Sequence, residues 1–272
     1  KVNTIRHTGA SSDAVTLASD GTCTAKITNR SNRRMNINGA FQVWQRSTSV
    51  SVSDGSNEDY QSADRWIFKY GSAAAGVATI SRSTDVPTRK GFGYSYKVDI
   101  TTANTSLANS YHVISEYRFE GQDIINSGWD YKSASSYLTT SFWFKTNKTG
   151  NPKLPLTFKI GSRYYCVEVT ISDTNWNKYS VTIPGDPSAG DIANDSASGF
   201  VMLIGWSIGD DRAGTGETWT STATYRTSNG ANFFDSTSND MYLTGVQLEV
   251  GDVATDFEHR SYGDELARCQ RY

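Results

Sequence analysis

The sequence predicts an all-β protein: a jelly-roll-like antiparallel β-sandwich preceded by a short extended or hairpin N-terminal arm. Three observations predict this fold. Ser (34) and Thr (30) make up a large share of the 272 residues and 12% are aromatic, which is typical of short strands joined by polar turns. Many segments alternate apolar and polar residues with a period of two, as half-buried strands do. All 33 aromatic residues lie after residue 40, so the chain has two unlike parts.

Residues 1–35 are predicted to form an N-terminal arm that anchors or trimerises the chain. Two β-prone runs, 14–18 and 22–28, flank Ser19-Asp20-Gly21, and Asp-Gly between such runs is a strong hairpin signal. A hairpin alone buries too little apolar area to be stable. We therefore expect the arm to need a partner surface, either the following domain or sister chains. The sequence does not begin with Met, which leaves open that it is a piece of a longer chain.

Residues 36–257 are predicted to form the sandwich. The alternation is clearest in residues 94–100, 165–171, 179–183, 200–208 and 242–248. Further strands are expected at 37–45, 63–70, 77–82, 111–119, 138–146 and 218–226. About eleven strands separated by polar turns favour a sandwich over a repeat architecture. Short helical turns are expected at 121–127 and 262–271.

Charge and composition exclude several classes of protein. The net charge of −2, from 26 basic and 28 acidic residues, offers no electrostatic basis for binding nucleic acid. No run approaches about 18 consecutive apolar residues, so no membrane insertion is expected. The first 15 residues also lack the apolar core of a signal peptide.

The cysteines indicate isolated thiols. Cys23, Cys166 and Cys269 match no metal or redox spacing, and their odd number argues against a disulfide framework. This pattern fits a protein assembled in a reducing cytoplasm.

Candidate catalytic residues are few. His7, His112 and His259 lie in no nucleophile motif, so a structural or surface role is favoured for each. Glu116 and Glu120 share one face of a predicted strand and form the best carboxylate pair for glycoside hydrolysis. A solvated strand surface is the simpler interpretation of that pair. No enzymatic activity, catalytic residue or cofactor is predicted.

Acidic loops could also bind a metal. Asp210 and Asp211, and the acidic residues within 186–195, could supply oxygen ligands for calcium, but the sequence lacks EF-hand spacing. Asp is also a common turn former, and this interpretation is favoured. No metal site is predicted.

Loop aromatic residues are the best candidates for ligand binding. Trp129, Trp176 and Trp219 fall at element ends or in polar surroundings, and Tyr225 is a further loop aromatic. Such rings stack on the apolar face of a sugar, while short polar side chains read its hydroxyl groups. These four are the predicted ligand-binding residues. The alternative is that their rings cap the core of the sandwich.

Several stretches together resemble a known group of proteins. They are residues 36–46 (NINGAFQVWQR), 63–66 (ADRW), 176–186 (WNKYSVTIPGD), 242–251 (YLTGVQLEVG) and 254–272 (ATDFEHRSYGDELARCQRY), with the opening 3–10 (NTIRHTGA). This set resembles the C-terminal modules of bacteriophage tail fibre and other virion appendage proteins, over nearly the whole chain.

The resemblance implies a homotrimer with a jelly-roll domain like those of carbohydrate-binding modules. Its arm would intertwine or add strands with sister chains. Residues 258–272 would pack on their own domain or on a neighbour. Related sandwiches often place an acidic calcium ligand in the final strand, but Leu243-Thr244-Gly245-Val246 carries no carboxylate, so no calcium is expected there.

We therefore expect a non-enzymatic structural protein of a phage virion, a tail-fibre-like appendage used in host-receptor recognition and adsorption. Its partners would be sister chains in a homotrimer, other virion proteins contacted through the arm, and a host surface glycan. It would be assembled in the host cytoplasm and located in the virion. The alternatives are a head fibre or capsid-decorating protein, a polysaccharide-degrading enzyme, and a cellular carbohydrate-binding module.

Overall fold

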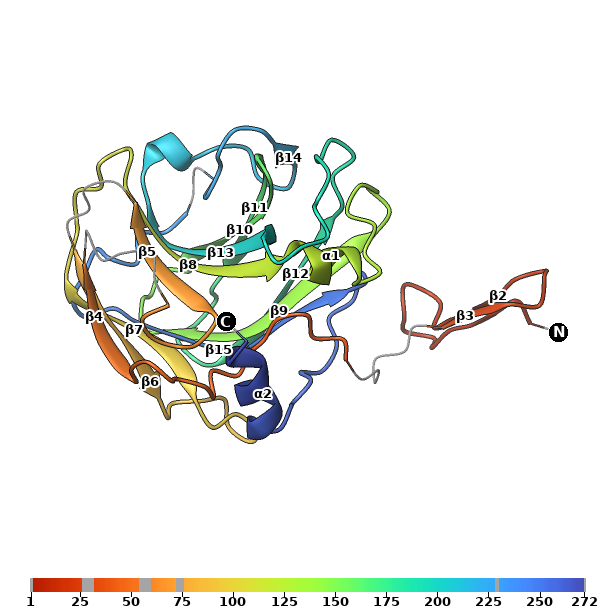
Figure 1. The fold of residues 1–272 in the computed structure, drawn as a ribbon, viewed down its shortest axis with the longest axis horizontal. Coiled ribbons are helices and arrows are strands. Elements are labelled where there is room, and N and C mark those ends of the chain that lie inside the picture. Colours follow the sequence, from red (N-terminus) through yellow and green to blue (C-terminus); the bar gives the residue numbers. More distant parts are fainter. Residues whose placement is uncertain (1, 26–31, 54–59, 72–75, 228–229, 272) are drawn as a thin grey trace. The chain divides into compact units, whose positions relative to one another are not determined.

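The computed structural model of the chain describes residues 2–25, 32–53, 60–71, 76–227 and 230–271 (Figure 1). The chain divides into an N-terminal unit, residues 1–32, and a sandwich unit, residues 33–272. Each unit is described by itself. Within the described ranges, no helix is long and apolar enough to cross a membrane.

The described part of the N-terminal unit is a three-stranded antiparallel sheet of β1 (Thr4–Ile5), β2 (Val15–Leu17) and β3 (Cys23–Ala25), in that order. The predicted hairpin is confirmed as β2 and β3. Its turn is held by the Asp20 carboxylate, which accepts hydrogen bonds from the backbone N–H (2.9 Å) and hydroxyl (2.7 Å) of Thr22. Strand β1 was not expected from the sequence.

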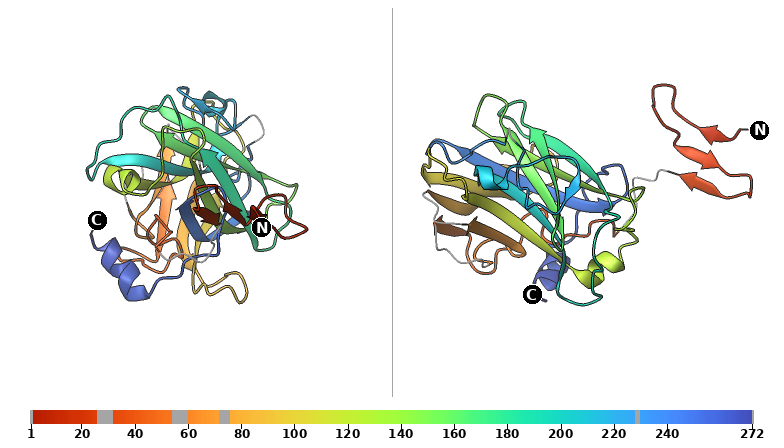
Figure 2. Two further views of the ribbon diagram at one scale, coloured as in Figure 1. Left: turned by 90° about the vertical axis from the view of Figure 1, so that its right-hand side faces the viewer. Right: turned by 90° about the horizontal axis from the view of Figure 1, so that it is seen from above.

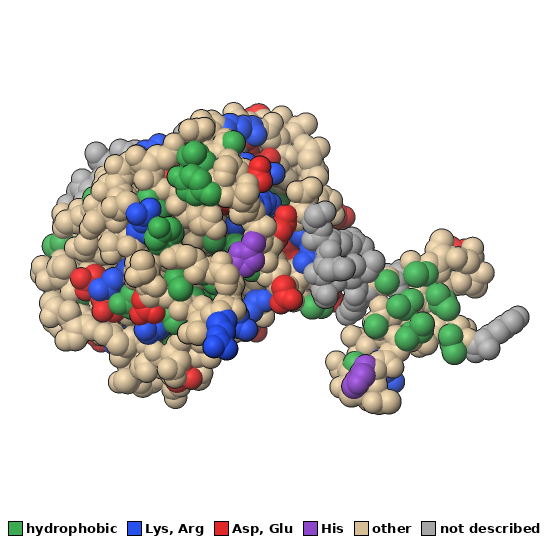
Figure 3. All heavy atoms as spheres, turned by 90° about the horizontal axis from the view of Figure 1, so that it is seen from below, with side chains coloured by type: hydrophobic (Ala, Val, Ile, Leu, Met, Phe, Trp, Pro, Cys, Tyr) green, Lys and Arg blue, Asp and Glu red, His purple; other side chains and the backbone are tan. Residues whose placement is uncertain are grey.

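The N-terminal unit leaves its largest apolar side chains in solvent. Val2, Ile5 and Leu17 are 63%, 56% and 40% exposed. Figure 3 shows hydrophobic side chains gathered on the face of this unit that is turned to the viewer. A sheet of this size therefore buries little apolar area within itself.

The described residues of the sandwich unit form two six-stranded sheets whose neighbouring strands are antiparallel. Sheet I contains, in order, β14 (Trp219–Thr220), β11 (Arg163–Thr170), β10 (Lys153–Ile160), β13 (Ser198–Ile208), β8 (His112–Glu120) and β5 (Trp66–Gly71). Sheet II contains, in order, β12 (Asn177–Pro184), β9 (Tyr137–Thr146), β15 (Asp240–Val250), β7 (Ser95–Thr102), β6 (Val77–Ser83) and β4 (Ser49–Ser53).

Two short helices, α1 (Gly121–Ile125) and α2 (Tyr262–Cys269), and the 3₁₀ turn η1 (Asp210–Arg212) complete the described elements. Figures 1 and 2 show the two sheets as facing layers. The predicted all-β antiparallel sandwich is thus confirmed. Both helices lie where short helical turns were expected.

Aromatic rings fill the space between the sheets. Trp206 and Tyr117 enter from sheet I, and Tyr96 and Phe144 enter from sheet II, each with at most 1% of its surface exposed. The Trp206 and Phe144 rings stack across the interface with their centres 6.3 Å apart. The indole N–H of Trp206 donates to the hydroxyl of Ser115 (2.8 Å), so this buried polar group is satisfied. The period-two pattern therefore works as predicted: alternate residues build a shared core.

Two predicted strands are wrong. Residues 37–45 form an irregular segment because Asn38 (φ 56°) and Phe41 (φ 50°) adopt left-handed backbone conformations. The Asn38 side chain then bonds the backbone of Val43, replacing a strand ladder. Of residues 218–226, only Trp219–Thr220 is a strand, because the chain turns back after it toward η1.

Strands β4 and β10 were not predicted. In β10, Pro155 argues against a central strand because it lacks an N–H. Pairing of β10 with β13 nevertheless begins only at Leu156, and β13 has a register shift between Gly205 and Ser207. Pro155 therefore pairs with Glu168 of β11 but lies outside the described pairing of β10 with β13.

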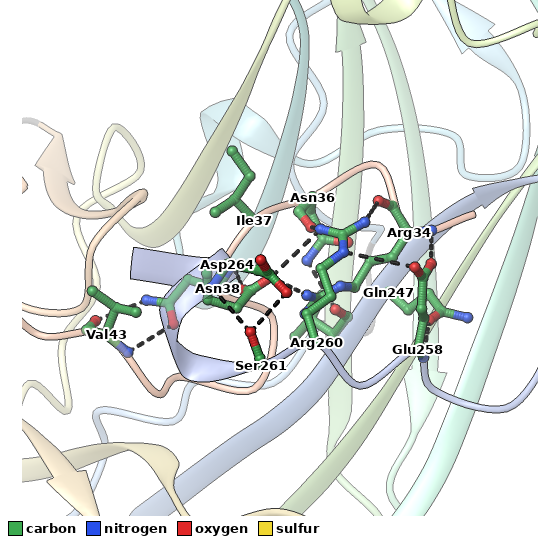
Figure 4. Close-up of polar contacts among 12 residues, drawn as sticks. Arg34, Asn36, Ile37, Asn38, Val43, Gln247, Glu258, Arg260, Ser261 and Asp264 are labelled. Carbon is green, nitrogen blue, oxygen red and sulfur yellow. Dashed lines mark hydrogen bonds and ion pairs between the residues drawn. The ribbon is translucent and has the colours of Figure 1, made fainter. Parts of the chain in front are cut away.

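The C-terminal tail packs on the sandwich unit through buried charges (Figure 4). The guanidinium of Arg34 forms an ion pair with Glu265, and these side chains are 1% and 2% exposed. Burial lowers the pKa of Arg34 to about 10. The backbone N–H groups of Arg33 and Arg34 both donate to Glu258 (2.8 Å each), and Arg260 donates to the carbonyl of Arg34.

The segment leading into the sandwich also lies along β15. The Asn36 amide donates to the carbonyl of Val246 (2.8 Å) and its side-chain oxygen accepts from the N–H of Leu248 (2.9 Å). The Gln247 side chain accepts from the N–H of Glu258 (2.7 Å). The first residues of the unit, its last strand and its tail are therefore one connected network.

We predict that Glu265→Gln lowers the free energy of unfolding by about 3 kcal/mol, because it leaves the buried Arg34 charge without its partner. Thermal and urea unfolding of the full chain measure this loss. The control is Asp191→Asn. It removes an ion pair with Lys132 at the surface, where the Asp191 side chain is 92% exposed. If both variants unfold at the same midpoint as the unmodified chain, the network does not stabilise the fold.

Candidate functional site

The outer face of sheet I carries the candidate site. In β8, Tyr117 and Phe119 are buried in the core, so Glu116 and Arg118 point away from it. The same alternation turns Lys159 of β10 outward. The two sheets thus use one set of side chains for the core and leave the other set for the surface.

Strand register lines up four outward side chains across this face. Tyr164 of β11 is paired with Lys159 of β10, Lys159 with Val201 of β13, and Val201 with Arg118 of β8. We call these four residues the cross-strand row. Each is half-buried, so each offers part of its surface to solvent.

A group of rings lies beside the cross-strand row. The Tyr225 ring centre is 6.0 Å from that of Tyr164 and 5.2 Å from that of His112. Two cations lie over the tyrosines: Lys159 Nζ is 5.7 Å from the Tyr164 ring centre, and Arg212 Cζ is 5.4 Å from the Tyr225 ring centre. The described face therefore combines rings with positive charge.

Tyr225 is held by the loop between η1 and residue 227. Its N–H donates to the carbonyl of Arg212 (2.8 Å). The loop is fixed to sheet I where Glu168 accepts from the N–H of Thr227 (2.8 Å) and where Arg226 donates to the carbonyl of Ile208 (2.8 Å). Beneath Tyr225 lie the buried side chains of Ile114, Leu203 and Ile208. The ring thus has a fixed apolar support.

A pocket of about 290 Å³ lies at the end of the same strands. Gly161 and Gly199 line it. Gly161 lies two residues after Lys159 and Gly199 two residues before Val201, and because β10 and β13 are antiparallel the pocket continues from the cross-strand row toward one end of these strands. Its polar side chains are Ser162, Arg163, Ser188, Asp191, Asp195 and Ser198. Hydroxyl and carboxylate groups of this kind suit a ligand rich in hydroxyl groups.

One wall of the pocket is fixed by Arg163. Its guanidinium donates to both carboxylate oxygens of Asp186 (2.6 and 3.2 Å) and to the carbonyl of Trp219 (3.2 Å). The hydrogen bonds to Asp186 raise the pKa of Arg163, which therefore remains charged. This wall is consequently set by residues of β11, β14 and the loop after β12.

The other wall is the loop that leads into β13. Its carbonyls at Ala197 and Asp195 accept from the N–H groups of Gly121 (2.8 Å) and Gln122 (2.9 Å). Its Ile192 N–H donates to the hydroxyl of Tyr131 (3.2 Å). The loop that leads into β13 is therefore hydrogen-bonded to α1 and to the segment that follows α1.

The structure does not bring the four predicted ligand-binding residues together. Tyr225 lies in the ring group, and Trp219 supports the pocket wall through its carbonyl. Trp129 is 3% exposed and packs on Phe200 (5.5 Å), so its ring belongs to the core end, as the alternative interpretation had it. Trp176 is half-buried beside Tyr242 of sheet II.

Sequence reasoning missed Tyr164, Lys159 and Arg118. The sequence did contain a signal for Tyr164. It immediately precedes the alternating run 165–171, and because Tyr165 faces the core, the neighbouring Tyr164 must face outward. Lys159 lies on an unpredicted strand, and only the register places it beside Tyr164.

The candidate catalytic residues are engaged by other side chains. Glu116 forms an ion pair with Arg118, and Glu120 accepts from Arg271 (2.9 Å). His259 contacts the rings of Phe92 and Phe257, and its burial lowers its pKa.

Carboxylates in the acidic loops also form ion pairs. Asp210 forms an ion pair with Arg226, and Asp186 forms one with Arg163. Among the described residues, no group of three or more His, Cys, Asp or Glu side chains could hold a metal ion. Cys23, Cys166 and Cys269 are free, and burial raises the pKa of Cys166 and Cys269 to about 12.

No protein-family model and no curated protein matches the sequence. Among solved structures, a CBM4 structure is 12% identical with a TM-score of 0.36, covering 79% of this chain and 98% of that one. A C-terminal family 22 carbohydrate binding module of Clostridium thermocellum Xyn10B is 12% identical with a TM-score of 0.37, covering 84% and 98%. The CBM22-1 xylan-binding domain from Paenibacillus barcinonensis Xyn10C is 9% identical with a TM-score of 0.34, covering 75% and 95%. Likenesses of this size carry no argument about function, and the fold rests on the strands and sheets given above.

We predict that Gly121→Ala displaces the pocket wall and lowers the free energy of unfolding by about 1–3 kcal/mol. A Cβ at this position would lie 2.1 Å from the carbonyl oxygen of Ala193. Hydrogen exchange followed by mass spectrometry should show faster exchange in residues 186–199. Gly190→Ala, in the same loop, is the matched control because nothing lies within 4 Å of its new Cβ. Equal exchange in the two variants would show that the wall is not held by this contact.

Proposed function

We propose that the chain is a non-catalytic carbohydrate-binding domain whose ligand lies along the outer face of sheet I. The observation that carries this proposal is the pair of half-buried rings, Tyr164 and Tyr225, next to a pocket rich in hydroxyl and carboxylate groups. A sugar has an apolar face that stacks on rings and hydroxyl groups that both donate and accept hydrogen bonds. The face offers a complement to each.

The dimensions of the pocket support a small ligand group. Its volume of about 290 Å³ is at the lower end of the range found for ligand pockets, so it suits one or two sugar rings and not a large ligand. The rest of a longer saccharide would extend over the cross-strand row. Loops fixed to a sandwich are common positions for binding residues.

The pairing of the two candidate carboxylates favours binding without catalysis. Hydrolysis of a glycosidic bond ordinarily needs two carboxyl groups, one of them free to protonate the leaving group. Glu116 is bound by Arg118, and Glu120 is bound by Arg271. Neither carboxylate is thus placed as a free acid on this face.

We predict that Tyr164→Ala and Tyr225→Ala each weaken saccharide binding about tenfold, because each removes a stacking surface. The measurement is affinity electrophoresis of the full chain in gels containing bacterial and plant polysaccharides, followed by calorimetry on those that retard it. Trp176→Ala is the control, since this half-buried ring lies beside Tyr242 on the other sheet. Loss of binding in that variant alone would move the site to sheet II, and binding to no polysaccharide would refute the proposal.

A second proposal concerns assembly. We propose that the chain forms a homotrimer through its N-terminal unit and serves as a tail-fibre-like virion appendage, assembled in the host cytoplasm and used in adsorption to the host. The exposed Val2, Ile5 and Leu17 support the assembly, because a unit this small ordinarily needs a partner surface. The virion role rests on the resemblance of the sequence. A head fibre or capsid-decorating protein is the other position in a virion that the same observation allows.

For assembly, we predict that the full chain has three times the mass of one chain in size-exclusion chromatography with light scattering, whereas residues 33–272 run as a monomer. Ile5→Asp with Leu17→Asp should also give monomers, because charges replace the exposed apolar side chains. A full chain that stays monomeric at micromolar concentration would contradict the proposal. Immunogold labelling of particles would then separate tail from head.

A further inference from the structure

Two cations on the outer face of sheet I have no counter-charge. Lys159 and Arg212 form no ion pair with any residue that the structure describes, although each lies over a tyrosine ring. Both side chains are half-buried, and the buried Nε of Arg212 makes no hydrogen bond within the described part of the chain. Neither charge is therefore held in an ion pair by a residue that the structure describes.

Neighbouring cations show the contrast. The following pairs are formed: Arg118 with Glu116, Arg226 with Asp210, Arg163 with Asp186 (2.6 Å), and on sheet II Lys97 with Asp240 (3.0 Å) and Lys145 with Asp85 (2.6 Å). On the face shown in Figure 3, basic and acidic side chains likewise lie intermixed. Lys159 and Arg212 therefore differ from these neighbouring cations, because neither forms an ion pair with a residue that the structure describes.

We propose that the saccharide bound at this face is acidic, and that its anionic group lies between Lys159 and Arg212 while a sugar ring stacks on Tyr164 or Tyr225. This inference rests on the carbohydrate-binding function proposed above and names the class of its ligand. The Tyr164 and Tyr225 ring centres are 6.0 Å apart, with Lys159 Nζ 5.7 Å from the first and Arg212 Cζ 5.4 Å from the second, so a sugar residue at the two rings would have one cation on each side. Ammonium and guanidinium groups form strong charge-assisted hydrogen bonds to such anions.

The pocket sets the direction of the ligand. Asp195 lines it and forms no ion pair within the described part of the chain, whereas Asp191 is paired with Lys132, so the carboxylate of Asp195 repels an anionic group from that end. The hydroxyl-rich part of the saccharide then occupies the pocket. The acidic group and the neutral part are thus separated along the strands β10 and β13.

The experiment uses two matched pairs of polysaccharides: polygalacturonate with its carboxyl-reduced form, and dextran sulfate with dextran. Affinities of the full chain are compared with those of Lys159→Gln and Arg212→Gln, after circular dichroism has shown that the variants fold. Lys90→Gln is the matched control. It makes the same change of charge at a lysine that also lies over a ring, 5.6 Å from the centre of Trp143 on sheet II.

We expect an acidic member to bind at least about tenfold more tightly than its neutral twin, and each of the two variants to weaken that binding about tenfold. Binding should also fall as salt is added, less steeply in the variants. Lys90→Gln should bind as the unmodified chain does. The two pairs distinguish a carboxylate from a sulfate ligand.

Three results would overturn the inference. If a neutral twin binds as tightly as its acidic partner, and Tyr225→Ala abolishes that binding, the site takes a neutral saccharide and the proposed function stands. If Lys90→Gln weakens acidic binding as much as Lys159→Gln does, the attraction is a non-specific effect of charge. If no member of either pair binds, the acidic ligand is rejected, and the broader polysaccharide panel decides the proposed function separately.

Discussion

Burial of aromatic rings between two antiparallel sheets is the constraint on which the rest of the structure depends. Trp206 and Phe144 meet across the sandwich, and the strands that carry them must turn every second side chain inward. The residues between them are then committed to the outside. Tyr165 is buried in the core, so its neighbour Tyr164 lies on the outer face. The candidate site is therefore built from the positions that the core leaves over.

The same constraint explains which parts of the fold could be predicted. Strands with regular alternation were found because local pattern and burial agree, as in residues 94–100. Residues 37–45 alternate as well, but Asn38 and Phe41 take left-handed conformations, and this depends on tertiary contacts such as the N–H of Asn38 donating to Glu265. Strand β10 was hidden by Pro155, which pairs with Glu168 of β11 but lies outside the pairing of β10 with β13 that begins at Leu156.

The site was less predictable than the fold because it depends on register. Tyr225 was recognised as a loop aromatic, yet its neighbour Tyr164 lies about 60 residues away in sequence, and nothing local pairs them. Lys159 meets Tyr164 only through the pairing of β10 with β11. Composition likewise cannot separate a core ring from a surface ring, and so Trp129 and Trp176, both predicted as ligand-binding, lie in different environments. Long-range pairing is the information that a single sequence lacks.

Charge is divided between two tasks in this chain. Around the tail, Arg34 and Glu265 are buried together, and Glu258 is bound by the adjoining backbone, so charge there holds the two ends of the sandwich unit together. These charges stabilise the fold and are not available to a ligand. Removing either partner would leave the other buried and unpaired. On sheet I, Lys159 and Arg212 lie over rings and not over carboxylates. A net charge of −2 is therefore compatible with two cations, Lys159 and Arg212, that form no ion pair with any residue that the structure describes.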